Sequence, residues 1–196
     1  MKNTRLSAWI TGGILILLLI YFISTYNKLV GKEEKLKLQW NEVQNAYQRR
    51  LDLIPNLVNV VKGGADYEQT TLQKLTEARA KAGSLQITGL PTAETYNQQT
   101  NAQNEIAGAA NRLMIAVEKY PDLKGTKAFS DLQTQLVGTE RRIKVARKDF
   151  NLAIADYNSY VKGFPTKIVA GVLGFHPKDG FQSDAGADKA VEISFQ

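Results

Sequence analysis

The chain of 196 residues is long enough for one ordinary domain and a short additional element, and its 43% apolar and 22% charged residues are typical of a folded protein. It contains no cysteine, which excludes disulfides and thiolate metal sites. The formal net charge of +6 comes from basic residues interspersed with acidic ones, which favours a mixed solvated surface over specific nucleic-acid binding.

The first predicted element is an uncharged apolar stretch from Leu6 to Ile23. As a helix it would span roughly 27 Å, close to the ~30 Å hydrocarbon core of a bilayer. Trp9, Tyr21 and Tyr26 occupy positions typical of interfacial aromatic residues. The residues that follow offer no small-x-small cleavage site, so we expect an uncleaved membrane helix rather than a signal peptide, with the lipid bilayer as its partner.

The basic residues around this stretch bear on its orientation. Two precede it and four follow it closely: Lys2 and Arg5, then Lys28, Lys32, Lys35 and Lys37. Because basic residues are retained on the cytoplasmic side, the count leans slightly towards a cytoplasmic C-terminal part.

Beyond residue 25, apolar residues recur at spacings of three and four, which is the periodicity of helices. The apolar series run from Leu29 to Val61, Leu72 to Ala82, Tyr96 to Tyr120 and Phe129 to Val161. Glycine and proline residues separate them. We therefore predict an all-α fold, in which an N-terminal transmembrane helix (residues 1–25) is followed by an up-and-down antiparallel bundle of long helices (residues 26–165).

Residues 166–196 differ from the rest and are expected to form a partly flexible tail. An apolar patch from Ile168 to Phe175 precedes a flexible stretch, and Val191, Ile193 and Phe195 then alternate like a short strand. The one histidine of the chain, His176, lies in this tail. One imidazole without cysteines does not supply the usual zinc or copper ligands, so we expect a surface residue.

The stretch from Gln48 to Gly64 combines apolar residues with an internal proline. Proline inside a helix removes one hydrogen bond and costs roughly 3 kcal/mol, whereas it is tolerated in a first turn. Asp52 to Pro55 therefore fits a helix restart, with Asp52 as cap and a kink at Pro55. The alternative is a continuous helix with a mild bend.

Five charged residues interrupt apolar helix faces and are candidate members of a polar network: Arg50, Glu68, Arg79, Glu140 and Arg147. Two interpretations remain open. In the first, these charges neutralise one another inside the bundle and fix the register of the helices. Alternatively, they line a polar pocket in which the unmatched arginine binds an anionic ligand.

Several short motifs then carry a family resemblance. In order they are Tyr26-Asn-x-Leu-Val30, Gln48-Arg-Arg-x-Asp-Leu-Ile-Pro-Asn-Leu-Val58, Val61-Lys-Gly63, Ala78-Arg-Ala80, Tyr120-Pro-Asp-Leu-Lys124, Glu140-x-x-Ile143, Ala146-Arg147, Tyr157-Asn158 and Phe164-Pro165. Over about residues 26 to 165, the chain resembles the LemA family of bacterial membrane proteins. The resemblance implies one N-terminal helix in the bacterial inner membrane and a soluble helical bundle attached to it, but no reaction. Residues 166–196 lie outside it.

No residue pattern points to catalysis, a cofactor or a metal. The chain has no Glu-x-x-His, Gly-x-Ser-x-Gly, Gly-x-Gly-x-x-Gly or phosphate-loop motif. We therefore expect a non-enzymatic membrane-anchored interaction or scaffold protein that binds another protein or a second copy of itself. The alternatives are a receptor or enzyme for an anionic small ligand, and an electrostatic binder of anionic lipid or nucleic acid.

Overall fold

The computed structural model describes residues 2–64, 69–85 and 87–181, and every regular element in these ranges is a helix. The helices are α1 (Lys2–Gly64), α2 (Gln69–Gly83), α3 (Ala93–Val117), α4 (Pro121–Lys124), α5 (Lys127–Lys162) and α6 (Thr166–Leu173). The predicted all-α bundle is confirmed. The alternation proposed for Val191, Ile193 and Phe195 lies outside the described residues.

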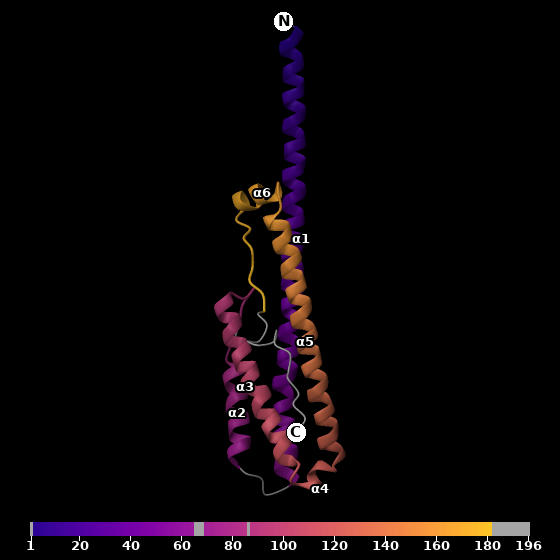
Figure 1. Ribbon diagram of the computed structural model, residues 1–196, viewed down its shortest axis with the longest axis vertical. Helices are drawn as coiled ribbons and strands as arrows, with labels where there is room; N and C mark the ends of the chain where they lie inside the picture. Colours follow the sequence, from indigo (N-terminus) through magenta and orange to yellow (C-terminus); the bar gives the residue numbers. More distant parts are fainter. Residues whose placement is uncertain (1, 65–68, 86, 182–196) are drawn as a thin grey trace, which may run out of the picture.

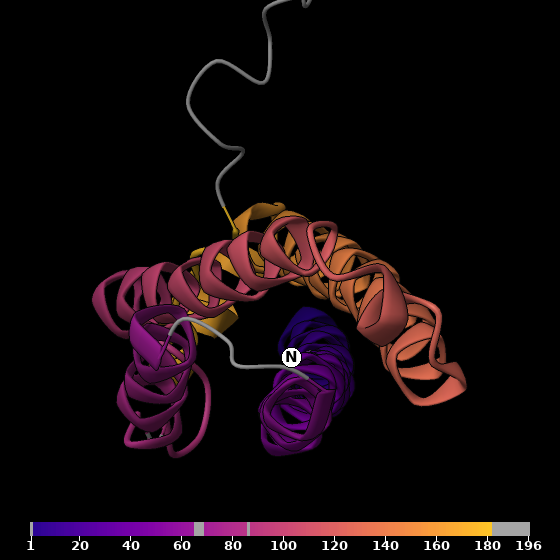
Figure 2. The same cartoon turned by 90° about the horizontal axis from the view of Figure 1, so that it is seen from below.

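Helix α1 is the spine of the molecule. Its N-terminal part projects alone beyond the other helices, whereas its C-terminal part packs beside the 36-residue helix α5, which runs in the opposite direction (Figure 1). Seen along the long axis, α2, α3 and α5 form an arc with α1 on its concave side (Figure 2). One helix thus belongs to both the projecting rod and the bundle.

The side chains of α1 change character along its length. The large apolar residues from Ile10 to Ile23 are exposed, whereas Leu29, Leu36 and Trp40 are buried in the bundle. By length and composition, α1 is able to cross a membrane. The exposed apolar part coincides with the membrane helix predicted from Leu6 to Ile23.

The core consists of two apolar clusters arranged along α1. The cluster distant from the projecting rod joins the last turns of α1 to α2, α3 and the beginning of α5. The cluster nearer the rod joins α1 to the second half of α5 and includes Trp40, Phe150 and Tyr157. Helix α3 packs mainly against α2, so α1 and α5 form one pair and α2 and α3 another.

Pro55 lies inside α1, and the helix continues through it to Gly64. The helix restart capped by Asp52 is therefore wrong, and the continuous alternative is correct. Asp52 is exposed and accepts a hydrogen bond from Gln48 Nε2 at 2.8 Å. Proline has no N–H for the carbonyl four residues before it, here Leu51. Arg79 Nε of α2 donates to that carbonyl at 3.0 Å and so replaces the missing helical hydrogen bond.

Part of the predicted flexible tail is ordered by the bundle. The apolar patch that begins at Ile168 belongs to helix α6, which ends at Leu173 and is capped by Gly174 with a φ of 78°. Residues 175–181, here called the C-terminal segment, then run back along the bundle (Figure 1). His176 within this segment is exposed, as predicted.

Replacing Arg79 with methionine is expected to lower the free energy of unfolding by about 1 to 3 kcal/mol, because the Leu51 carbonyl is left without a donor. In a Pro55→Ala background the same replacement should have a smaller effect, since alanine at this position restores the helical N–H. Urea unfolding of the full chain in detergent, followed by circular dichroism, measures both. Arg112→Met is the matched control, because Arg112 is exposed on α3 and bonds within its own helix. Equal losses in the two backgrounds would contradict the compensation.

Candidate functional site

Arg50 connects three helices at the middle of the bundle. Its side chain is only 4% exposed, and its Nη1 donates to the backbone carbonyl of Gln103 at 2.9 Å and to Gln103 Oε1 at 3.0 Å. Its Nη2 forms an ion pair with Glu140 on α5. Because few other contacts join α1 to α3, this guanidinium is the main polar connection between these two helices.

The five charges of the predicted polar network do not form one buried cluster. Glu140 is 47% exposed, so the Arg50–Glu140 pair reaches the surface. Arg79 bonds to the Leu51 carbonyl instead, and Arg147 lies over the ring of Phe181 at 4.3 Å from its centroid. Glu68 lies outside the described residues. The structure therefore brings together Arg50, Glu140 and Arg147, and it places Arg79 elsewhere.

These three residues line an open cleft of about 880 Å³ between α1, α3 and α5, here called the Arg50 groove. Its lining residues are Tyr47, Arg50, Gln103, Asn104, Ala107, Glu140, Arg141, Ile143, Lys144, Arg147, Lys148, Asn151 and Phe181. Five of them are cationic and only Glu140 is acidic. The groove therefore favours ligands that carry negative charge or hydrogen-bond acceptors.

One end of the Arg50 groove already binds a polypeptide, the C-terminal segment. Asn151 Nδ2 donates to the carbonyl of Phe181 at 2.9 Å, and Asn151 Oδ1 accepts from the N–H of the same residue at 2.7 Å. Seven residues along α5, Asn158 makes the same pair of bonds to Lys178, each at 2.8 Å. Two asparagines on one face of α5 thus bind the main chain of an extended segment.

The segment is fixed at its end by an aromatic cluster. Phe181 contacts Tyr96, Phe150 and Trp40, with ring centroids 3.9, 5.8 and 6.3 Å away. These three rings come from α3, α5 and α1, so the segment closes the bundle where the helix pairs meet. Each aromatic pair adds stabilisation of order 0.5 to 1.5 kcal/mol beyond its burial.

Gly180 fits between the two asparagine contacts because it lacks a side chain. A Cβ at this position would lie 2.8 Å from Asn151 Oδ1 and 3.4 Å from Ile154 Cδ1. The close approach allows the amide of Asn151 to reach the next residue, Phe181. A side chain at position 180 would therefore have to displace the amide of Asn151.

The tyrosines around the groove are poor proton donors and nucleophiles. Burial raises the pKa of Tyr47 and of Tyr96 above the ordinary value for a phenol, and nearby Arg147 only partly offsets this. Burial also raises the pKa of Tyr157 to about 12. All three therefore stay neutral at physiological pH. Within residues 2–64, 69–85 and 87–181, no group of three His, Asp or Glu residues lies close enough to bind a metal ion.

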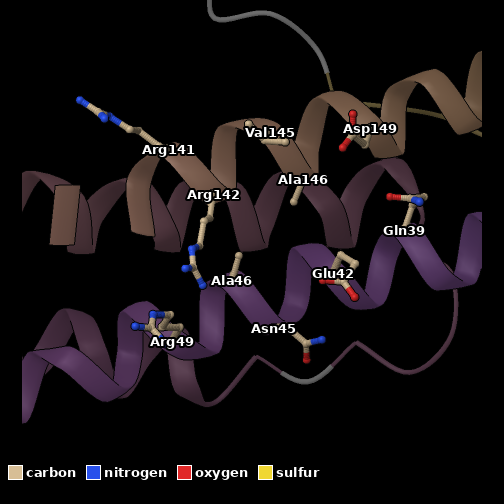
Figure 3. Close-up of a pocket in the computed structure, with 10 residues that line it drawn as sticks. All are labelled: Gln39, Glu42, Asn45, Ala46, Arg49, Arg141, Arg142, Val145, Ala146 and Asp149. Atoms are coloured by element: carbon tan, nitrogen blue, oxygen red, sulfur yellow. The ribbon is translucent and has the colours of Figure 1, made fainter. Parts of the chain in front are cut away.

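A second cleft of about 590 Å³ lies between α1 and α5 on another face (Figure 3). Arg142 points from α5 towards α1, whereas Arg141 points away from it (Figure 3). Three arginines and two acids, Glu42 and Asp149, are among its lining residues, so its charges are mixed. The Arg50 groove is the stronger candidate because it holds a buried charge and a bound segment.

The sequence contains a signal for the two asparagines that bind the C-terminal segment, but the periodicity of apolar residues does not reveal it. Asn151 and Asn158 each follow a buried aromatic residue, Phe150 and Tyr157, and are spaced by seven residues on one helix. That spacing places both amides on one face of α5. Their partner could not be identified, because the C-terminal segment has no helical pattern to connect it with the bundle.

Comparison with known proteins supports the bacterial membrane-protein resemblance. The model of the LemA family matches residues 39–195. The chain is 27% identical over 176 residues to Protein LemA of Metamycoplasma hominis, covering 84% of this chain and 77% of that protein. It is 26% identical over 200 residues to magnetosome protein MamQ 2 of Paramagnetospirillum magneticum, covering 91% and 74%. Magnetosome protein MamQ of Magnetospirillum gryphiswaldense matches to the same extent.

The family match corrects one expectation about the tail. Residues 166–196 were placed outside the family resemblance, whereas the match continues to residue 195. The match therefore includes α6, the C-terminal segment and both asparagines of α5. The segment is short and lacks helical periodicity, so residue spacing alone does not connect it with the family.

Replacing Arg50 with methionine is expected to lower the free energy of unfolding by about 1 to 3 kcal/mol, because it removes the buried donor of both Gln103 acceptors, while Glu140 remains half-exposed. Glu140→Gln should cost about 1 kcal/mol or less, since the half-exposed amide oxygen can still accept from Arg50. Thermal and urea unfolding of the full chain in detergent give both values. Arg141→Met, at an exposed position on the same groove, is the control. Equal losses for Arg50→Met and Glu140→Gln would show that the ion pair, and not the bonds to Gln103, dominates.

Proposed function

Since the chain belongs to the LemA family, we propose that it is a membrane-anchored, non-enzymatic interaction protein that binds extended polypeptide segments in the Arg50 groove. The exposed apolar part of α1 provides the anchor, and the helices beyond it provide the binding surface. The membrane proposed is the bacterial inner membrane, with the bundle on the cytoplasmic side.

The observation that carries this proposal is the pair of hydrogen bonds from Asn151 to the main chain of Phe181. Both bonds involve backbone atoms, so they are available to any chain in an extended conformation, as at the edge of a sheet. The aromatic cluster and the close approach at Gly180 then add selectivity. Main-chain affinity combined with side-chain selectivity is the usual basis of peptide recognition.

The composition of the Arg50 groove supports binding rather than catalysis. Its lining side chains are cations, amides and apolar groups, and its one carboxylate, Glu140, is paired with Arg50. The neutral tyrosines add no general base. The lining offers neither an activated nucleophile nor a pair of titratable groups with opposite pKa shifts.

The excess of cations in the Arg50 groove favours a second candidate, a receptor for a small anionic ligand. A small ligand would raise the melting temperature progressively as its concentration exceeds its Kd, without displacing the C-terminal segment. Electrostatic binding through the residues after the membrane helix has less support. Lys32 pairs with Asp156, Lys37 with Glu34 and Lys178 with Glu33, so much of this charge is already neutralised.

The proposed orientation is testable because the chain has no cysteine. In intact spheroplasts, a membrane-impermeant maleimide is expected to label Asn3→Cys rapidly and to label Ser130→Cys, at an exposed position on α5, only after permeabilisation. Labelling is read by gel shift. Rapid labelling of Ser130→Cys in intact spheroplasts would place the bundle outside the cytoplasm.

Peptide binding in the Arg50 groove is tested with the segment itself. A chain that ends at Phe175, reconstituted in nanodiscs, is expected to bind a fluorescent peptide of residues 174–186 saturably, and the intact chain should bind it more weakly because its own segment competes. Asn151→Ala should weaken binding about 10-fold or more, since two hydrogen bonds are lost. A peptide with Gly180→Ala should also bind less tightly.

The matched control is Asn45→Ala, at an exposed amide in the second cleft, which should leave peptide binding unchanged. Circular dichroism of each shortened variant establishes that the bundle is folded. A folded shortened chain that does not bind the peptide, or Asn151→Ala binding as tightly as the parent, would contradict the proposed groove.

A further inference from the structure

Helix α6 lies crosswise to α1 at the level where the bundle ends and α1 continues alone (Figure 1). Thr166, its first residue, places its Oγ1 3.4 Å from the hydroxyl of Tyr21. Phe175, just after the helix, contacts the ring of Tyr26 edge-on, with centroids 6.2 Å apart. Helix α6 is thereby fixed beside the end of the exposed apolar stretch of α1.

The side chains of α6 are apolar on two sides, and the bundle covers only one of them. Thr166, Val169 and Ala170 are buried, in contact with α1 and α5. The other apolar side chains in and before the helix form an exposed row at intervals of four residues: Phe164 (87% exposed), Ile168 (62%) and Val172 (75%). Ile168 and Val172, four residues apart in α6, lie on one face of the helix, and Phe164 precedes them just outside it.

We propose that the row formed by Phe164, Ile168 and Val172 docks on the surface of the bilayer that α1 crosses. An apolar helix face that lies in the plane of a membrane interface inserts shallowly among the headgroups and first methylenes. Because α6 lies crosswise to α1, its axis is parallel to the membrane plane when α1 spans the membrane. The large exposed side chains of α1 from Ile10 to Ile23 continue the same apolar surface.

The charges near α6 agree with a lipid headgroup region. Helix α6 contains no acidic residue, and the exposed Lys162 and Lys167 lie before and within it. The nearest described acid on α5, Asp156, accepts from Lys32 Nζ at 2.8 Å, and this hydrogen bond lowers the pKa of Asp156. Basic residues beside the surface are attracted to anionic lipids by about 1 kcal/mol each.

A second protein chain fits this row less well than the bilayer does. An eight-residue helix is only about 12 Å long, and three side chains cover far less than the roughly 1,000 Å² that a specific interface needs. The bilayer is already adjacent to the row when α1 spans it, so docking orders no additional partner. The inference rests on α6 and α1 and is independent of peptide binding in the Arg50 groove.

The experiment uses the full chain in liposomes of phosphatidylcholine and phosphatidylglycerol. Single cysteines at Ile168 and Val172 are labelled with an environment-sensitive fluorophore. Lipids with a nitroxide near the headgroup are expected to quench both labels at least twofold, and aqueous iodide should quench them little. Leu152→Cys, at an exposed apolar position on α5 within the bundle, is the matched control, and its label should show the opposite pattern.

A further variant tests whether the apolar row itself causes docking. Ile168→Asp is expected to abolish nitroxide quenching of a label at Val172, whereas Leu152→Asp should leave it unchanged. Circular dichroism shows whether each variant remains folded. Two results would overturn the proposal. In the first, iodide quenches the labels at residues 168 and 172 as strongly as the label at residue 152. In the second, neither iodide nor the lipid nitroxides quench the labels, which would mean that protein covers the row.

Discussion

The continuity of helix α1 through Pro55 is the constraint on which the rest of the structure depends. If the helix ended there, its last turns could not contribute to the core cluster shared with α2 and α3. Arg79 prevents this loss by donating to the carbonyl that proline leaves free. A residue on the second helix therefore completes the first, which couples the formation of α2 to the straight course of the spine.

Arg50 has a related role at the centre of the bundle, since it joins α1 to α5 and to α3, and α1 and α3 otherwise share few contacts. The same arrangement leaves an open, cationic groove rather than a sealed core. The C-terminal segment covers one end of that groove through Asn151 and the aromatic cluster. The residues that join the helices, Arg50 and Glu140, are thus also residues of the groove proposed to bind peptides.

Periodicity predicted the helices because each long helix buries one apolar stripe, and that signal is local in the sequence. The errors arose where a distant residue decides the outcome. The local cost of Pro55 favours a break, but Arg79, on the next helix, offsets it. The charges on apolar faces are unusual and visible in the sequence, but their partners are not, because a guanidinium can bind a carbonyl, a carboxylate or a ring. Glu140 reaches solvent and Arg147 stacks on Phe181, which no spacing rule predicts.

The length of α1 gives the molecule a fixed reach. From Thr25 to Gly64 the helix extends roughly 60 Å at about 1.5 Å per residue. The pairing of α5 along this length stiffens it. Helix α1 therefore holds the short helix α4, and the ends of α2 and α5 that are distant from the membrane, at a fixed distance from the bilayer. A partner that binds these ends must therefore extend to that distance from the membrane, whereas among the described residues α6 and the adjacent end of the bundle lie nearest to the membrane surface.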